Sequence, residues 1–232
     1  MKNNQRITFG LVITIAIFLT SKFVSSKIHL NSEWIPDTFI SLSIILLLSV
    51  IAICVMRKDL DYKISFPKLN TVIKPIVIAL VATILINILM TLVTKLAGGK
   101  DELHPAFLKM SWKQIFVFVF IYASIAEEIL FRGFLLNSLK SLKPIGVTFF
   151  KRRINLSVII SALAFGSAHL TLISTGVDSL FVMRIVLFAT CLGIIAGYYQ
   201  EKYDNNAYAI IVHMSGNSIA VIGSFLMSLG IR

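Results

Sequence analysis

The chain carries ionisable side chains at helical spacing inside stretches that are otherwise apolar. Glu127, Glu128 and Arg132 lie in one such stretch, and Glu128 and Arg132 are four residues apart, so they share a helix face and can pair. A structural salt bridge, or an arginine that reaches back to the membrane surface, would account for that pair. Glu127 is turned by about 100° from Glu128 around a helix and is left outside the pair. We expect Glu128 and Arg132 to anchor the helix and to fix the direction of Glu127.

Two further apolar stretches carry polar groups of the same kind. His213 and Asn217 are again four residues apart, so an imidazole and an amide lie on one stripe of a helix. His169 follows Phe165 at the same spacing in a third stretch. A lone buried histidine is usually an ordinary core residue. Three apolar segments that each carry an acid, a base or an amide have no satisfactory partners except one another, so we expect one shared interior site.

This set of side chains could activate water or bind a metal. Glu127 would act as a general base toward a water molecule, and His169 would hold that water or a metal. His213 and Asn217 would donate hydrogen bonds to the oxyanion that forms when water attacks a peptide carbonyl. The pattern predicts hydrolysis of amide bonds that reach the membrane.

The elements that must position these residues are membrane-spanning helices. Of the 232 residues, 57% are hydrophobic and 14% are charged, with a mean hydropathy of +0.88, whereas a soluble domain carries about 25% charged residues. The apolar blocks have the length that crosses a hydrocarbon core of about 30 Å as helix. We therefore expect an all-α fold, one polytopic transmembrane helical bundle over residues 1–232. Its seven spans are expected at 7–23, 38–56, 75–96, 112–135, 154–173, 180–199 and 207–228.

Several other local features fit this class. The first apolar block could be taken for a signal peptide, but residues 21–27 make a poor cleavage site and six more spans follow, so we expect a retained helix. Pro75 is expected at the start of the third span, where a missing N–H costs least. Cys54 and Cys191 lie in apolar blocks without the spacing of a disulfide or a metal site, and we expect them to be packing residues.

The basic charge predicts an orientation in the membrane. The net charge of +11 could indicate a nucleic-acid partner, but the cations gather in short loops between the apolar blocks, above all in 57–74 and 136–153. That is the positive-inside signature, so we exclude nucleic acid and place both loops and the N-terminus in the cytoplasm. Trp34 and Trp112 then mark the outer interface. Four tyrosines mark the inner one: Tyr198, Tyr199, Tyr203 and Tyr208.

The depth of the polar residues sets one structural condition. At 1.5 Å per residue, Glu127 and His213 lie about 10 to 13 Å from the inner ends of their spans, whereas His169 lies about 20 Å from its own. If the three side chains meet, residues 150–157 should form a helix outside the bilayer before the fifth span begins.

The three motifs resemble those of the CPBP family, the CAAX-protease and bacteriocin-processing membrane proteins once called abortive-infection proteins. The family pattern is Glu-Glu-x-x-x-Arg, then Phe-x-x-x-His, then His-x-x-x-Asn, and it appears here at 127–132, 165–169 and 213–217. Each motif is short, but three in the correct order on separate spans make a specific match. The resemblance covers residues 110–228, which we take as the catalytic core, while the first three spans share only their hydrophobicity.

The resemblance implies an intramembrane endopeptidase of the type II CAAX prenyl protease kind, acting on a membrane-associated peptide or protein. In that family the first glutamate and first histidine are thought to activate water, and the later histidine and asparagine to form the oxyanion hole. These roles fall on Glu127, His169, His213 and Asn217. Zinc held by Glu127, His169 and His213 stays one alternative, and water activated without a metal is the other. The compact two-histidine helix motif of soluble zinc proteases does not occur in the sequence.

Two other functions stay open. A non-catalytic bacteriocin-immunity or peptide-regulating membrane protein would keep the fold and bind a partner peptide. A transporter would use Glu127, His169 and His213 as a proton relay, but transporters usually show paired repeats and none is visible. The lysine, isoleucine and asparagine content and the short length favour a multi-pass protein of a bacterial plasma membrane, with the lipid bilayer and a peptide substrate as partners.

Overall fold

The computed structural model describes residues 1–99, 103–149 and 151–230. In chain order its elements are α1 (Asn3–Ser25), α2 (Thr38–Val55), α3 (Leu69–Leu96), α4 (Pro105–Lys109), α5 (Trp112–Gln114), η1 (Ile115–Ala123), α6 (Ser124–Glu128), η2 (Ile129–Leu136), η3 (Lys140–Leu142), β1 (Gly146–Phe149), β2 (Arg152–Asn155), α7 (Leu156–Ala168), η4 (His169–Thr175), α8 (Ser179–Tyr203) and α9 (Ala207–Ser228). Helices dominate throughout, as the composition predicts.

Seven helices among the described residues are long and apolar enough to cross a membrane. They are α1, α2, α3, the continuous run from α5 to η2, α7 together with η4, α8 and α9. The all-α class and the seven expected spans are confirmed. The largest shift is in the third span, which begins at Leu69 and therefore places Pro75 inside α3 rather than at its start.

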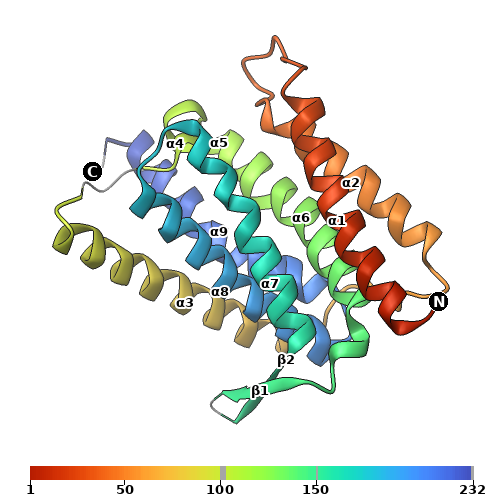
Figure 1. Cartoon of the computed structure of the whole chain (residues 1–232). Coiled ribbons are helices and arrows are strands. Elements are labelled where there is room, and N and C mark those ends of the chain that lie inside the picture. The colour runs from red at the N-terminus through yellow and green to blue at the C-terminus, as the bar shows by residue number, and fades with distance from the viewer. Residues whose placement is uncertain (100–102, 150, 231–232) are drawn as a thin grey trace.

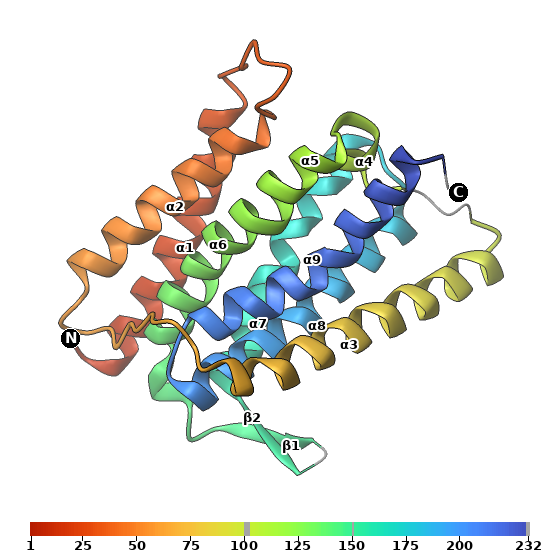
Figure 2. The same cartoon turned by 180° about the vertical axis from the view of Figure 1, so that it is seen from behind.

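The fourth span lies between two groups of helices (Figures 1 and 2). On one side, α1 and α2 pack against each other and against η2, and their buried apolar residues form one core with those of η2. On the other side, α3 packs on α8 and α9 around a second apolar core. The fourth span also contacts α7 and α9, so its side chains can face helices from both groups.

The fourth span is wound unevenly around its polar residues. After the short α5 at its start, only Ser124–Glu128 is α-helical, and the segments before and after it, Ile115–Ala123 and Ile129–Leu136, are π-helical. A π-turn bonds each N–H to the carbonyl five residues earlier, and such turns occur frequently at functional sites. Both glutamates thus lie in one short α-helical turn between wider ones.

Small residues bring α7 and α8 close together. A Cβ added at Gly166 would lie 2.0 Å from Thr190 Oγ1, and one added at Gly193 would lie 3.1 Å from the Cα of Ala162. Gly193 and Gly197 form the small-x-x-x-small pattern that lets membrane helices approach with their backbones nearly in contact. The close approach brings α8 against the helix that carries Phe165.

One end of the bundle gathers the segments that the charge pattern places together. The N-terminal amine lies 2.8 Å from Asp59, and Lys140 and Lys63 pair with Asp61 and Asp204. At the opposite end, Gln114 donates hydrogen bonds to the backbone carbonyls of the loop before α2, including that of Trp34. The loops 57–74 and 136–153 therefore share one end with the N-terminus. Which side of the membrane that end faces stays a prediction.

The expected helix over residues 150–157 is wrong. Residues 146–149 and 152–155 form an antiparallel β-hairpin, with Gly146 opposite Asn155 and Phe149 opposite Arg152, and α7 begins at Leu156. Residue 150 lies outside the described residues. β-branched Val147, Thr148 and Ile154 favour strand. The depth estimate assumed upright helices, whereas tilt between packed spans also sets the depth of a side chain.

Candidate active site

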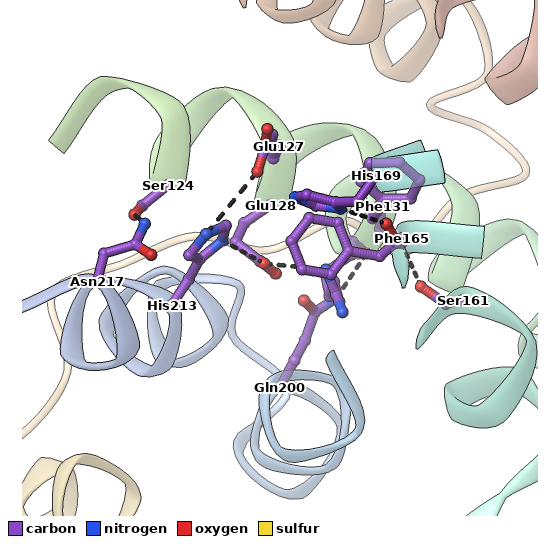
Figure 3. A network of polar contacts seen from close by, with 11 residues as sticks. Ser124, Glu127, Glu128, Phe131, Ser161, Phe165, His169, Gln200, His213 and Asn217 are labelled. Atoms are coloured by element: carbon purple, nitrogen blue, oxygen red, sulfur yellow. Dashed lines mark hydrogen bonds and ion pairs between the residues drawn. The ribbon is translucent and has the colours of Figure 1, made fainter. Parts of the chain in front are cut away.

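His213 of α9 lies between the two glutamates of α6 (Figure 3). Its Nδ1 is 2.9 Å from Glu128 Oε1, and its Nε2 is 3.8 Å from Glu127 Oε2. A carboxylate oxygen can only accept, so Nδ1 carries a hydrogen and donates it to Glu128. The side chains of His213 and Glu128 are 5% and 1% exposed, whereas that of Glu127 is 22% exposed. Glu127 is therefore the glutamate that another molecule can reach.

Glu128 also forms the ion pair expected from the sequence. Arg132 Nη1 donates to Glu128 Oε1 at 2.9 Å, and both side chains are buried. The guanidinium lies over the ring of Phe165, with Cζ 4.6 Å from the ring centroid. A Cβ on Gly193 would lie 2.3 Å from Arg132 Nη2, so the glycine leaves the space that the guanidinium occupies. The arginine holds Glu128, and through it His213, in place.

His169 packs against the ring of Phe165, which also contacts His213 (Figure 3). The Phe165 ring is 5.1 Å from the His169 ring and 5.3 Å from the His213 ring, edge-on to both. His169 Nδ1 is 3.0 Å from the backbone carbonyl of Phe165 and must donate to it. In the neutral ring, Nε2 then keeps its lone pair and can accept a hydrogen bond.

Asn217 lies one turn beyond His213 on α9, on the side away from His169 (Figure 3). Its Nδ2 donates to the carbonyl of Val119 at 3.3 Å and to Ser124 Oγ at 3.2 Å. Both distances are long for such bonds. The amide therefore joins α9 to the fourth span, just before the two glutamates.

Three polar residues that the sequence reasoning passed over support this arrangement. Ser124 holds Asn217, Ser161 donates to the carbonyl of Phe131 at 2.7 Å, and Gln200 donates to the carbonyl of Arg132 at 2.8 Å. The last two bonds attach α7 and α8 to the π-helical part of the fourth span. In the sequence, the only indication of these residues is a polar side chain inside an apolar block. Serine gives a weak indication of this kind because its side chain is small and uncharged.

The residues proposed as metal ligands do not gather around a common point. Within the described part of the chain, no group of three His, Cys, Asp or Glu side chains is placed to hold a metal ion. Both ring nitrogens of His213 face glutamates, and Nδ1 of His169 is engaged with a backbone carbonyl. As arranged, Glu127, His169 and His213 do not fit a metal.

His104 adds a titratable group in the loop beside α4. Burial lowers its pKa to about 4, and repulsion from Arg184, or from His169 when that ring is protonated, acts in the same direction. Its ring lies 6.0 Å from that of Phe181 in α8. His104 is therefore neutral at pH 7.

The fold and the site define a polytopic membrane protein whose buried polar centre is built from the last four spans. Residues 109–219, which contain every residue of the three motifs, match the family model of the type II CAAX prenyl endopeptidase Rce1-like proteins. The resemblance inferred from the motifs is thereby confirmed, and this part of the chain is similar to that family of CAAX-type intramembrane proteases. Comparison with curated proteins and with solved structures gave no match.

Proposed function

We propose that the protein hydrolyses a peptide bond of a membrane-associated peptide or protein, with water as the nucleophile. One observation carries this proposal: Glu127 is the accessible carboxylate of the centre, and its Oε2 faces His213 Nε2 at 3.8 Å. That distance is too long for a hydrogen bond but short enough for one water molecule to contact both atoms. Residues 1–232 would form one membrane domain with 110–228 as its catalytic core.

Glu127 is the general base of the proposed reaction. It takes a proton from water as the water oxygen attacks the carbonyl carbon, and the carbonyl oxygen becomes an oxyanion. Glu127 then returns the proton to the leaving nitrogen as the C–N bond breaks. His169 Nε2 accepts a hydrogen bond from the attacking water, because its Nδ1 is held by the Phe165 carbonyl.

His213 and Asn217 are the proposed oxyanion donors. Since Glu128 holds Nδ1–H of His213, Nε2 donates to the oxyanion when the ring carries both protons. Asn217 would exchange one of its two long bonds, to Val119 or to Ser124, for the substrate oxygen. Glu128 and Arg132 position these groups without contacting the substrate.

The test compares Glu127→Ala and Glu127→Gln with the wild-type protein in cells, by mass spectrometry of membrane-associated peptides. We expect both variants to accumulate an uncleaved substrate and to lose roughly 10²–10⁴-fold in cleavage rate, the usual contribution of a general base. Glu33→Gln is the matched control, because Glu33 lies in the loop between α1 and α2, away from the centre.

An unchanged peptide profile in both Glu127 variants would contradict the proposed proteolytic function. It would favour the non-catalytic alternative, a bacteriocin-immunity or peptide-regulating protein that binds its peptide without cutting it. Such a protein would keep its protective effect in Glu127→Ala cells, whereas a protease would lose it.

A further inference from the structure

The β1–β2 hairpin projects from the end of the bundle that carries the N-terminus (Figures 1 and 2). Hydrogen bonds fix its base to α8: Glu201 accepts from Ser157 Oγ at 3.0 Å and from Asn155 Nδ2. Lys143, which precedes β1 in the chain, lies 3.7 Å from the same carboxylate. The hairpin is therefore held in a fixed position at this end of the bundle.

The register of the hairpin divides its side chains into two faces. Residues directly opposite each other in an antiparallel pair point to the same side of the sheet. One face carries Val147, Phe149, Arg152 and Ile154. The other carries Gly146, Thr148, Arg153 and Asn155. The first face is mainly apolar and the second is polar.

The apolar face contacts α8 through Arg152. Arg152 belongs to this face, and its guanidinium lies 5.8 Å from the ring centroid of Tyr198 in α8. Val147 and Phe149 nevertheless remain 56% and 60% exposed, so the protein leaves much of their surface uncovered. The hairpin thus presents exposed apolar surface next to α8.

Aromatic residues gather near this surface. Tyr199, Tyr203 and Tyr208 stack at this end of α8 and α9, with ring centroids 6.2 and 4.1 Å apart. Tyrosines prefer the headgroup level of a bilayer. Because α7 begins directly after β2, the hairpin must lie at the same level.

The charge of the hairpin matches an anionic surface. Residues 136–155 contain no Asp or Glu. Lys140 and Lys143 lie near Asp61 and Glu201. In the described part of the chain, Lys151, Arg152 and Arg153 form no ion pair with a carboxylate.

We propose that this hairpin docks on anionic phospholipid, with Val147 and Phe149 inserted at the boundary between headgroups and acyl chains. Lys151 and Arg152 lie among the phosphates, while Thr148 and Arg153, on the opposite face, remain in water. The inference does not depend on the proteolytic function, because it uses neither Glu127 nor any of its partners.

The test scans the hairpin with an environment-sensitive fluorophore on single cysteines. In a background of Cys54→Ala and Cys191→Ala, the labelled positions are Val147→Cys, Thr148→Cys and Phe149→Cys in the full chain, reconstituted into vesicles of phosphatidylcholine with about 30% phosphatidylglycerol. We expect blue-shifted emission and quenching by spin-labelled lipid at 147 and 149 but not at 148. Thr148→Cys is the matched control, since it labels the opposite face of the same strand.

A second arm uses vesicles of phosphatidylcholine alone, and anionic vesicles at high salt. We expect both to weaken the quenching at 147 and 149, because screening and loss of anionic lipid remove the attraction to the cations. Equal emission at all three positions would overturn insertion of the apolar face. Equal quenching in neutral and anionic vesicles would overturn the preference for anionic lipid.

Discussion

Glu127 and Glu128 are neighbours in sequence but occupy different environments. Glu128 is buried, accepts from Arg132, and holds the Nδ1–H of His213. Glu127 is partly exposed and faces the other nitrogen of the same ring. A helix separates adjacent side chains by about 100°, which is enough to give one glutamate a structural environment and leave the other accessible.

Glu128→Gln should destabilise the protein far more than Glu127→Gln. Loss of the Glu128 charge leaves the fully buried Arg132 without its counter-ion, and breaking one side of a buried ion pair costs about 3–5 kcal/mol. Thermal unfolding of the two variants in detergent, beside the wild-type protein, measures the difference. Equal unfolding temperatures for the two variants would show that the pair does not stabilise the bundle.

His104 should make stability depend on pH below neutrality. Its folded-state pKa of about 4 lies below the ordinary value of 6.5, so the unfolded chain binds the proton more readily between these two values. Stability linked to His104 is therefore full above about pH 6.5 and falls as the pH drops toward 4.

The measurement is the unfolding temperature from pH 7 to pH 4 in the wild-type protein and in His104→Gln. We expect a smaller decrease in the variant, because glutamine takes up no proton. His29→Gln is the control, since His29 is exposed in the loop after α1, and it should follow the wild-type curve. A His104→Gln curve parallel to wild type would contradict the prediction.

The interface between α7 and α8 determines where the arginine of the site can lie. Gly193 leaves room both for the backbone of α7 at Ala162 and for the guanidinium of Arg132. Ser161 and Gln200 attach the same two helices to the carbonyls of the π-helical segment η2. Close packing and the polar centre thus depend on the same helix contact.

Gly193→Ala should impair both stability and cleavage. The added Cβ would lie 2.3 Å from Arg132 Nη2, so the guanidinium must move away from its place beside Glu128. Overpacking of this kind costs about 1–3 kcal/mol. Gly223→Ala in α9 is the matched control, because its Cβ meets no atom within 4 Å. Unfolding temperature and cleavage rate are the measurements, and equal behaviour of the two variants would contradict the role of Gly193.

In the whole bundle, α1 begins at one end of the spans and α9 finishes at the other (Figure 1). An odd number of crossings requires this arrangement. The charge-rich loops and the hairpin lie at the N-terminal end, and Trp34 and Trp112 lie at the other. The loops richest in Lys and Arg therefore lie together at one end of the bundle.

We expect the N-terminal end to face the cytoplasm of a bacterial cell, because short loops rich in Lys and Arg are retained there. A membrane-impermeant thiol reagent on intact cells tests this with single cysteines in the background without Cys54 and Cys191. Ser26→Cys, between α1 and α2, should be labelled, whereas Lys58→Cys should be labelled only after the membrane is permeabilised. The reverse pattern would show the opposite orientation.

The span number and the Glu128–Arg132 pair follow from the sequence because both depend on local geometry. An apolar block of sufficient length makes a span wherever it occurs, and residues four apart on a helix are neighbours in any fold. The three motifs also single out Glu127, His169, His213 and Asn217, whose catalytic roles stay a prediction. In the structure His169 and His213 pack on Phe165, His213 contacts Glu128, and Asn217 contacts Ser124.

The contacts between helices do not follow from the sequence in the same way. His213 and Glu128 are 85 positions apart, and Asn217 and Ser124 are 93 apart. Whether such residues meet depends on the tilt and register of the packed helices. Small residues such as Gly193 affect both, because they set how closely two helices can approach. The same dependence explains why the depth estimate for His169 called for a helix where the chain forms a hairpin. Tertiary packing, rather than residue spacing, determined which nitrogen of His213 faces which glutamate.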